Sequence, residues 1–151
     1  MFEELDDIGW SLLEHAYGTA EEIPGLLRAL SSPQAEERRK ALDRFYSAVH
    51  HQGDVYPSTA ASLPLLFELA AAPSTPDRAA VVALVVSVGR ESLERGFDDD
   101  GTEIEYYPPD GCAQAAAFLR ARDVEFAELV RDRDRMCAWP RFPVWGCSST
   151  M

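Results

Sequence analysis

The sequence is poor in cysteine, and its three cysteines lie far apart in a chain of 151 residues. Cys112, Cys137 and Cys147 form neither the dense pattern of a disulfide-stapled secreted domain nor the CxxC spacing of a zinc site. We therefore expect reduced thiols in a cytoplasmic protein. The N-terminal stretch Met1–Glu4 is acidic, the opposite of the basic start of a secretory signal, and this agrees with that location.

Positive charge and long apolar runs are also scarce. Lysine and arginine number 14 against 26 acidic residues, which gives a formal net charge of −12, and Lys40 is the only lysine. A groove for a phosphate backbone needs clustered Lys and Arg, so we expect no nucleic acid partner. A soluble protein, or one with a basic partner, fits this charge. The longest apolar run, Ala79–Val88, is shorter than the roughly 20 residues of a bilayer span, so we expect no membrane contact either.

The chain does contain an internal duplication between Ile23 and Gly89. A shift of 40 positions superposes Pro24 on Pro64, Leu26 on Leu66, Leu27 on Phe67, Pro33 on Pro73, Glu37-Arg38 on Asp77-Arg78, and Leu42, Phe45 and Tyr46 on Val82, Val85 and Val86. Apolar residues at spacings of three and four indicate amphipathic helices. Each half therefore reads as a pair of helices, and a period near 40 is typical of helical repeat arrays.

Helix end signals extend this pattern to six expected helices. Asp6 or Asp7 could cap the first, and Gly18 could end it. Ser32 is the expected N-cap of the third, with Pro33 in its first position, and Gly53 can adopt the left-handed conformation after its end. The first helix would bury Ile8, Leu12, Leu13 and Ala16. The expected ranges are about 6–18, 20–30, 33–50, 57–72, 76–95 and 112–134.

The fifth expected helix holds the most apolar stretch of the chain. It is apolar nearly all round, so it should be the central buried helix. Its valines also permit a strand, but the corresponding segment of the first half is clearly helical. Residues 96–111 follow as a long acidic loop, and loops of this length are often functional. We divide the chain into a helical repeat domain, 1–135, and a proline- and aromatic-rich tail, 136–151.

The duplicated residues resemble HEAT repeats, which carry a proline in their first helix and an acid–arginine pair at the start of the second. Pro24 with Glu37-Arg38, and Pro64 with Asp77-Arg78, fit this pattern. The segment His51–Tyr56, followed by Thr59-Ala60 and Leu63-Pro64, looks like a signature of bacterial HEAT-repeat proteins of unassigned role. The resemblance covers about Trp10 to Arg95 and implies an all-α, short HEAT-like solenoid of about six helices in antiparallel pairs. No third clean copy follows. The outer helices could cap the array, which would give a monomer, or the chain could self-associate as a homodimer.

Polar and aromatic residues after the third helix form the candidate contact surface. Histidines there could instead cap the helix, because an imidazolium gains from the helix dipole. The alternative is a patch on the rim of the solenoid, since polar residues with an adaptable aromatic suit recognition. The candidate partner-binding residues are His50, His51, Gln52, Asp54 and Tyr56, together with the aromatic residues Trp10, Tyr17, Tyr106 and Tyr107.

Catalytic and metal-binding interpretations find less support. Placing Gly101 at the sixth position of a calcium loop puts Gly96 and Tyr107 at its ends, where carboxylates are required, so a solvated acidic loop is favoured. An irregular site that uses Asp98, Asp100 and Glu103 stays open. Cys112 follows a glycine at a helix start, where a thiolate is favoured, but no histidine lies nearby in sequence. We therefore predict no catalytic residue, metal or cofactor.

The sequence thus favours a non-enzymatic protein-binding module, of the scaffold or regulatory kind, because repeat arrays build extended surfaces. The charge of −12 supports an alternative, an acidic inhibitor or immunity protein for a basic toxin or nuclease. A HEAT-like enzyme, of the DNA glycosylase or bilin lyase type, is disfavoured because a glycosylase needs a basic groove.

Overall fold

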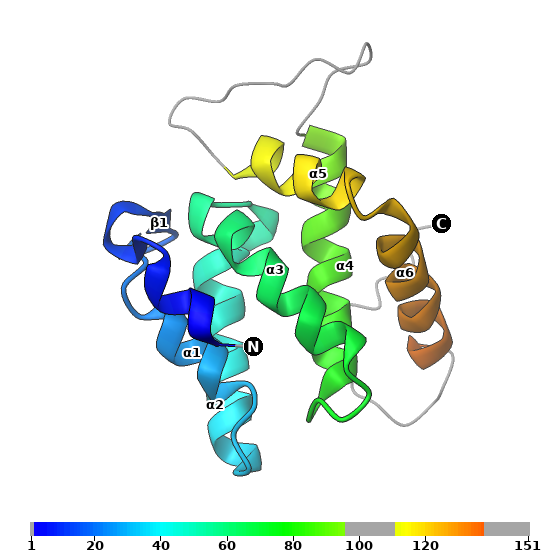
Figure 1. Ribbon diagram of the computed structural model, residues 1–151, viewed down its shortest axis with the longest axis horizontal. Helices are drawn as coiled ribbons and strands as arrows, with labels where there is room; N and C mark the ends of the chain where they lie inside the picture. The colour runs from blue at the N-terminus through cyan, green and yellow to red at the C-terminus, as the bar shows by residue number, and fades with distance from the viewer. Residues whose placement is uncertain (1, 96–110, 138–151) are drawn as a thin grey trace.

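The protein is all-α, with one two-stranded hairpin near its N-terminus (Figure 1). The computed structural model describes residues 2–95 and 111–137. Its α-helices are α1 (Ile23–Ala29), α2 (Ala35–Val49), α3 (Pro57–Ala71), α4 (Arg78–Arg95), α5 (Cys112–Arg120) and α6 (Asp123–Cys137). The hairpin pairs β1 (Glu14–His15) with β2 (Gly18–Thr19), and short 3₁₀ helices span Glu3–Asp7, Trp10–Leu12 and His51–Gly53.

Helix α4 lies at the centre of the described structure and contacts α3, α5 and α6 (Figure 1). Val82, Val85 and Val88 are completely buried in it. The prediction of a central buried helix is therefore confirmed, and the strand that the valines also permitted is excluded. Branched residues form helix here because packing on three sides outweighs their small deficit in helix propensity.

Both halves of the duplication form a helix–turn–helix, α1 with α2 and α3 with α4. Arg38 donates to two carbonyl oxygens in the turn before α2 and to Asp77, with 2.7 Å between Nε and Oδ2. Arg78, 40 positions later, donates to the carbonyl oxygen of Ala70 and, at 2.9 Å, to the carboxylate of Asp132. Each arginine thus bonds to the backbone near the connection between the two helices of its own pair, and to an acidic residue further along the chain. The carbonyl partners are not equivalent positions, since a shift of 40 places Ser32 and Pro33 on Ala72 and Pro73, so the duplication and the solenoid arrangement both stay predictions.

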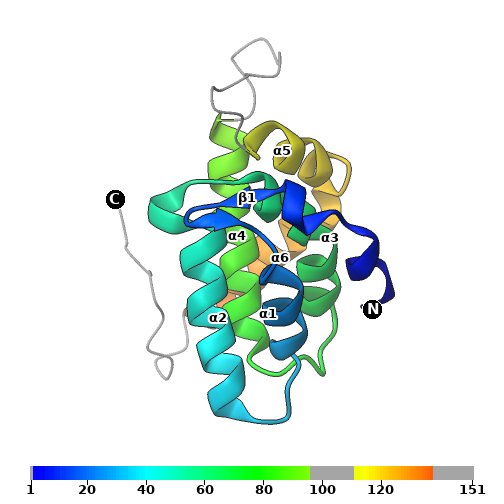
Figure 2. The same ribbon diagram turned by 90° about the vertical axis from the view of Figure 1, so that its left-hand side faces the viewer.

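The prediction of a first helix over residues 6–18 is wrong. Two 3₁₀ helices and the β1–β2 hairpin occupy this stretch instead, and the hairpin lies across the end of α2 (Figure 2). Gly9 lowers helix propensity by about 1 kcal/mol, and Gly18 has a φ of +133°, which L side chains rarely adopt. The backbone N–H of Ala16 donates to the carbonyl oxygen of Ala48, one of the carbonyls that a helix end leaves unpaired. Leu12, expected on the buried face, is 87% exposed.

Helix α2 begins two residues later than expected. Gln34 is its N-cap. In the turn before the helix, the Ser32 hydroxyl oxygen accepts a hydrogen bond from the Gln34 backbone N–H at 3.2 Å. Pro33 is therefore in the turn and not in the first helical position. At the other end, Gly53 has the expected left-handed conformation, with a φ of +89°, and Gln52 shares it at +54°.

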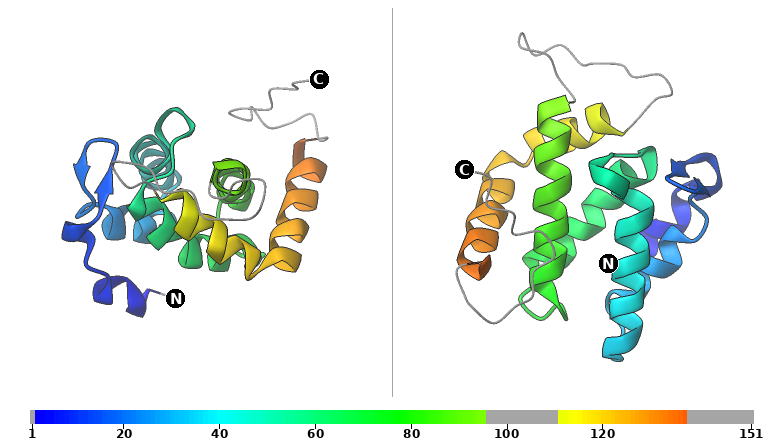
Figure 3. Two further views of the ribbon diagram at one scale, coloured as in Figure 1. Left: turned by 90° about the horizontal axis from the view of Figure 1, so that it is seen from above. Right: turned by 180° about the vertical axis from the view of Figure 1, so that it is seen from behind.

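The single last helix expected over residues 112–134 is also wrong, because the chain bends after Ala121 and divides it into α5 and α6 (Figure 3). Phe118 and Phe126 both reach Phe67, with ring centroids 5.3 and 6.5 Å away. In one straight helix these two residues would be about 12 Å apart along the axis. The bend lets both rings pack on the same aromatic side chain, and neither glycine nor proline marks it in the sequence.

Candidate functional site

The hairpin brings Tyr17 against the segment that follows α2. The Tyr17 hydroxyl lies 3.1 Å from Nδ1 of His51, and the two rings meet edge to face with centroids 5.5 Å apart. The Arg44 guanidinium lies over the Tyr17 ring, 5.1 Å from its centroid. Two predicted contact residues from distant parts of the sequence therefore do lie together.

Asp54 and Tyr56 lie in the same region, at the ends of α2 and α4. Asp54 accepts a hydrogen bond from Arg95 at 3.1 Å. Partial burial raises the pKa of Tyr56, and the negative charge of the Asp54 carboxylate raises it further. We call Tyr17, His51, Asp54 and Tyr56 the rim patch. Its polar groups are largely bonded to one another or to neighbouring arginines.

Two other predicted contact residues, His50 and Trp10, do not join this surface. The His50 side chain is buried: Nδ1 donates to the Asp54 carbonyl oxygen at 2.9 Å, and Nε2 lies 2.8 Å from the Ser87 hydroxyl. His50 is the C-cap of α2, but burial lowers its pKa, which favours neutral imidazole over the imidazolium expected from the helix dipole. Trp10 is buried too, and its indole N–H donates to the Leu5 carbonyl oxygen at 2.7 Å. Gln52 is exposed.

Tyr106 and Tyr107 lie outside the described residues. So do the aspartates of the calcium interpretation and most of the predicted tail.

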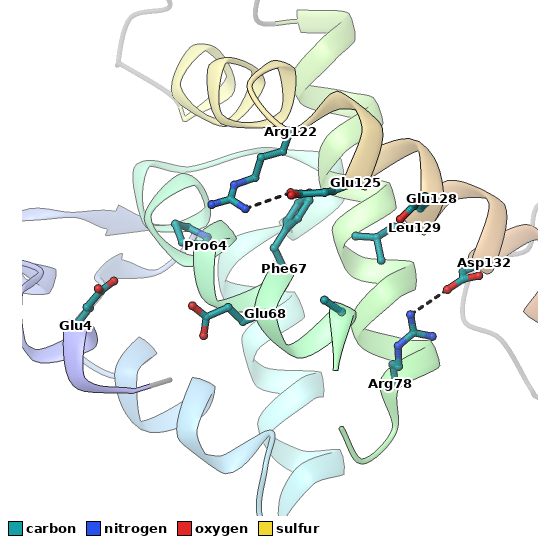
Figure 4. Close-up of a pocket in the computed structure, with 11 residues that line it drawn as sticks. Glu4, Pro64, Phe67, Glu68, Arg78, Arg122, Glu125, Glu128, Leu129 and Asp132 are labelled. Atoms are coloured by element: carbon teal, nitrogen blue, oxygen red, sulfur yellow. Dashed lines mark hydrogen bonds and ion pairs between the residues drawn. The ribbon is translucent and has the colours of Figure 1, made fainter. Parts of the chain in front are cut away.

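A groove between α3 and α6 was not expected from the sequence (Figure 4). Its volume is about 470 Å³. One wall is a face of α3 whose lining residues are spaced at i, i+3, i+4 and i+7. The lining residues of α6, which forms the other wall, have the same spacing, so each helix presents one continuous ridge. The residues that line this α3–α6 groove are Glu4, Pro64, Phe67, Glu68, Ala71, Arg78, Arg122, Glu125, Glu128, Leu129 and Asp132.

The floor of the groove is apolar and formed by well-packed side chains. Phe67 and Leu129 are only 5% and 6% exposed, and they form part of the core. The edge-to-face contact of Phe67 with Phe118 fixes the position of its ring. Arg122 lies over the Phe118 ring, 5.1 Å from its centroid, at the upper end of the groove. A ligand side chain would therefore meet a preformed surface.

The walls of the groove are acidic, with five carboxylates against two guanidinium groups. Both arginines already have partners: Arg78 pairs with Asp132 at 2.9 Å, and Arg122 pairs with Glu125 at 3.1 Å (Figure 4). The remaining carboxylates, Glu4, Glu68 and Glu128, are exposed and form no ion pair with any described residue. Three carboxylates around an apolar floor thus lack a cation.

Only half of this groove has a signal in the sequence. Pro64, Phe67, Glu68 and Ala71 mix apolar and acidic side chains at helical spacing, which could have indicated an accessible ridge. The opposite wall depends on the bend after Ala121, which lets α6 pack on α4 and face α3 across the groove. Residues 131–135 instead read as a fully solvated helix face.

The Cys112 side chain is completely buried, so it is not placed as an accessible nucleophile. Within the described ranges, no three His, Cys, Asp or Glu side chains lie close enough together to hold a metal ion. None of the helices in the same ranges combines the length and apolar character needed to cross a bilayer.

Comparison with protein families, curated proteins and solved structures gave no match for this chain. The HEAT resemblance of the duplicated residues therefore has no support from a relative. The groove and the rim patch have to be judged from their own chemistry.

Proposed function

We propose that this protein is a non-enzymatic protein-binding module that receives a segment of its partner in the α3–α6 groove. One observation carries the proposal: a groove of about 470 Å³ has the buried side chains of Phe67 and Leu129 at its base and is flanked by Glu4, Glu68 and Glu128, which have no cation among the described residues. Concave apolar sites with a few convergent polar groups are where ligands ordinarily bind.

The groove is a better candidate than the rim patch because its groups have unused bonding capacity. In the rim patch, Tyr17 is within hydrogen-bond distance of His51, and Asp54 is bonded to Arg95. A partner there would have to break existing interactions. In the groove a partner would add interactions without replacing any, which favours binding at this site.

Affinity capture with groove variants tests this function. Ala71 is exposed at the end of α3 and lines the groove, so Ala71→Lys should leave the fold intact while filling the groove with a cation. Ala117→Lys is the matched control, because Ala117 is exposed on α5 outside the groove. A partner should be retained by the wild-type protein and the control and lost from Ala71→Lys. Equal retention by all three proteins would reject the groove, and retention by none would reject the binding function.

Inhibition of a basic enzyme is a narrower second candidate, supported by the same unpaired carboxylates and by the net charge of −12. Co-expression with the product of the neighbouring gene should then relieve its toxicity. The Ala71→Lys variant should fail to do so, and no relief by the wild-type protein would reject this candidate.

A further inference from the structure

We infer that the occupant of the α3–α6 groove is a basic amphipathic helix of a partner protein, with one apolar side chain on the floor and Lys or Arg side chains against both walls. This inference rests on the proposed function and specifies the chemistry of the partner.

The distribution of charge selects a cationic occupant. Glu4 and Glu68 lie on the α3 side of the groove, and Glu128 lies on the α6 side (Figure 4). Unpaired carboxylates stand on both sides of the apolar floor, so a segment with cations on both of its flanks would find a carboxylate on each side. A second copy of this chain carries the same charge of −12, and like charge disfavours it as the occupant.

The form of the walls selects a helix. The groove residues Pro64, Phe67, Glu68 and Ala71 of α3 form one ridge at i, i+3, i+4 and i+7. Glu125, Glu128, Leu129 and Asp132 of α6 form the second ridge with the same spacing. Side chains of a third helix can pack into the groove between two such ridges. A helix also carries an apolar stripe with charges on both of its flanks, which matches the floor and the two walls.

The floor of the groove is where the apolar side chain of the partner helix would bind. Phe67 and Leu129 are held by the core, and they lie at the base of the groove, whose whole volume is about 470 Å³. One leucine- or phenylalanine-sized side chain can enter this space while the rest of the helix lies along the rim. Aromatic and aliphatic anchors in preformed pockets usually carry most of the binding energy of such contacts.

Fluorescence anisotropy with the full-length protein and three labelled peptides tests the inference. The first is an amphipathic helix of leucine and lysine, the second has the same composition in scrambled order, and the third has glutamate in place of lysine. The amphipathic basic peptide should bind most tightly, and its affinity should fall as salt concentration rises. Equal binding of the scrambled or the acidic peptide would overturn the inference.

Matched variants locate the peptide. Glu68→Gln with Glu128→Gln should weaken binding of the amphipathic basic peptide by about five- to tenfold, the loss expected for two partly exposed ion pairs. The control, Glu14→Gln with Glu94→Gln, changes two exposed carboxylates outside the groove and should alter affinity less than twofold. Equal affinity of the two double variants would overturn the inference.

The remaining outcomes separate this inference from the proposed function. Capture of a partner that Ala71→Lys abolishes, together with no binding of the basic peptide, would overturn the inference and leave the binding function standing. A homodimer that Ala71→Lys dissociates would identify a second copy as the occupant and would also overturn it. A basic peptide that binds and is displaced by the captured partner would support both.

Discussion

Substitution of Gly89 by alanine tests how α6, one wall of the groove, is held on α4. Gly89 is buried in α4, and a Cβ atom there would lie 2.3 Å from Cζ and 2.5 Å from Cε2 of Phe126. Carbon atoms in contact are normally about 3.5–4.0 Å apart, so the ring would have to retreat by more than 1 Å. Because the ring is packed against Phe67, α6 would move with it.

Two effects of opposite sign determine how Gly89→Ala changes the free energy of unfolding. Gly→Ala inside a helix ordinarily stabilises by about 1 kcal/mol. Overpacking of a core site costs about 1–3 kcal/mol, and two overlapping ring atoms place Gly89→Ala in the upper half of that range. We therefore expect a net loss of about 1–2 kcal/mol. With Phe126→Leu the ring is gone, so the same alanine should stabilise by up to about 1 kcal/mol.

Urea denaturation followed by circular dichroism measures this double-mutant cycle. The expected coupling energy between the two positions is about 2–3 kcal/mol, at the high end for residues in contact. Gly25→Ala in α1 is the matched control, because its added methyl group meets nothing within 4 Å and should not destabilise. A Gly89→Ala effect of the same sign in both backgrounds would refute the packing of α6 on α4.

Three further outcomes are expected. Gly111→Ala should destabilise by about 1–3 kcal/mol in thermal unfolding, because its Cβ would lie 2.0 Å from the Tyr56 carbonyl oxygen; an unchanged melting temperature would contradict this contact. Arg38→Ala should lower the free energy of unfolding by about 1–3 kcal/mol through loss of its charge-assisted hydrogen bonds. Arg39→Ala, at an exposed position, should have a much smaller effect, and equal effects would argue against that role of Arg38. Burial lowers the pKa of His50, so the stability that neutral His50 contributes is complete above the unfolded-state pKa of about 6.5 and is lost as pH falls below that value. Urea midpoints measured from pH 7.5 to 5 should therefore decrease more steeply in the wild-type protein than in His50→Asn, and identical slopes would refute this assignment.

The central helices were predictable because local pattern and tertiary environment agree. In α3 and α4, apolar spacing, a proline at the first position of α3 and a valine-rich buried stretch all favour the same element. The structure places α3 and α4 within two residues of the expected bounds. Here a sequence window alone contains enough information to locate the core.

The N-terminal segment and the last helix were mispredicted because distant residues determine their conformation. Ala16 is held by the end of α2, and a helical pattern over residues 6–18 cannot reveal that hydrogen bond. The bend between α5 and α6 depends on Phe67, which lies more than 50 positions earlier in the chain. In both segments, contacts across the fold override a plausible local pattern.

The same limit applies to the candidate site. The rim patch was partly predictable, since His51, Asp54 and Tyr56 are neighbours in sequence, but the burial of His50 depends on Ser87 of α4. The groove could not be found from the sequence because its two walls meet only after the bend that separates α6 from α5.

Amide chemical shifts of the full-length protein, followed by NMR during titration with the basic amphipathic peptide, test the groove most directly. The account predicts that shifts change mainly along residues 64–71 of α3 and along residues 122–132, from the bend into α6. Changes concentrated at residues 14–19 and 51–56 would place the binding surface on the rim patch and contradict the account.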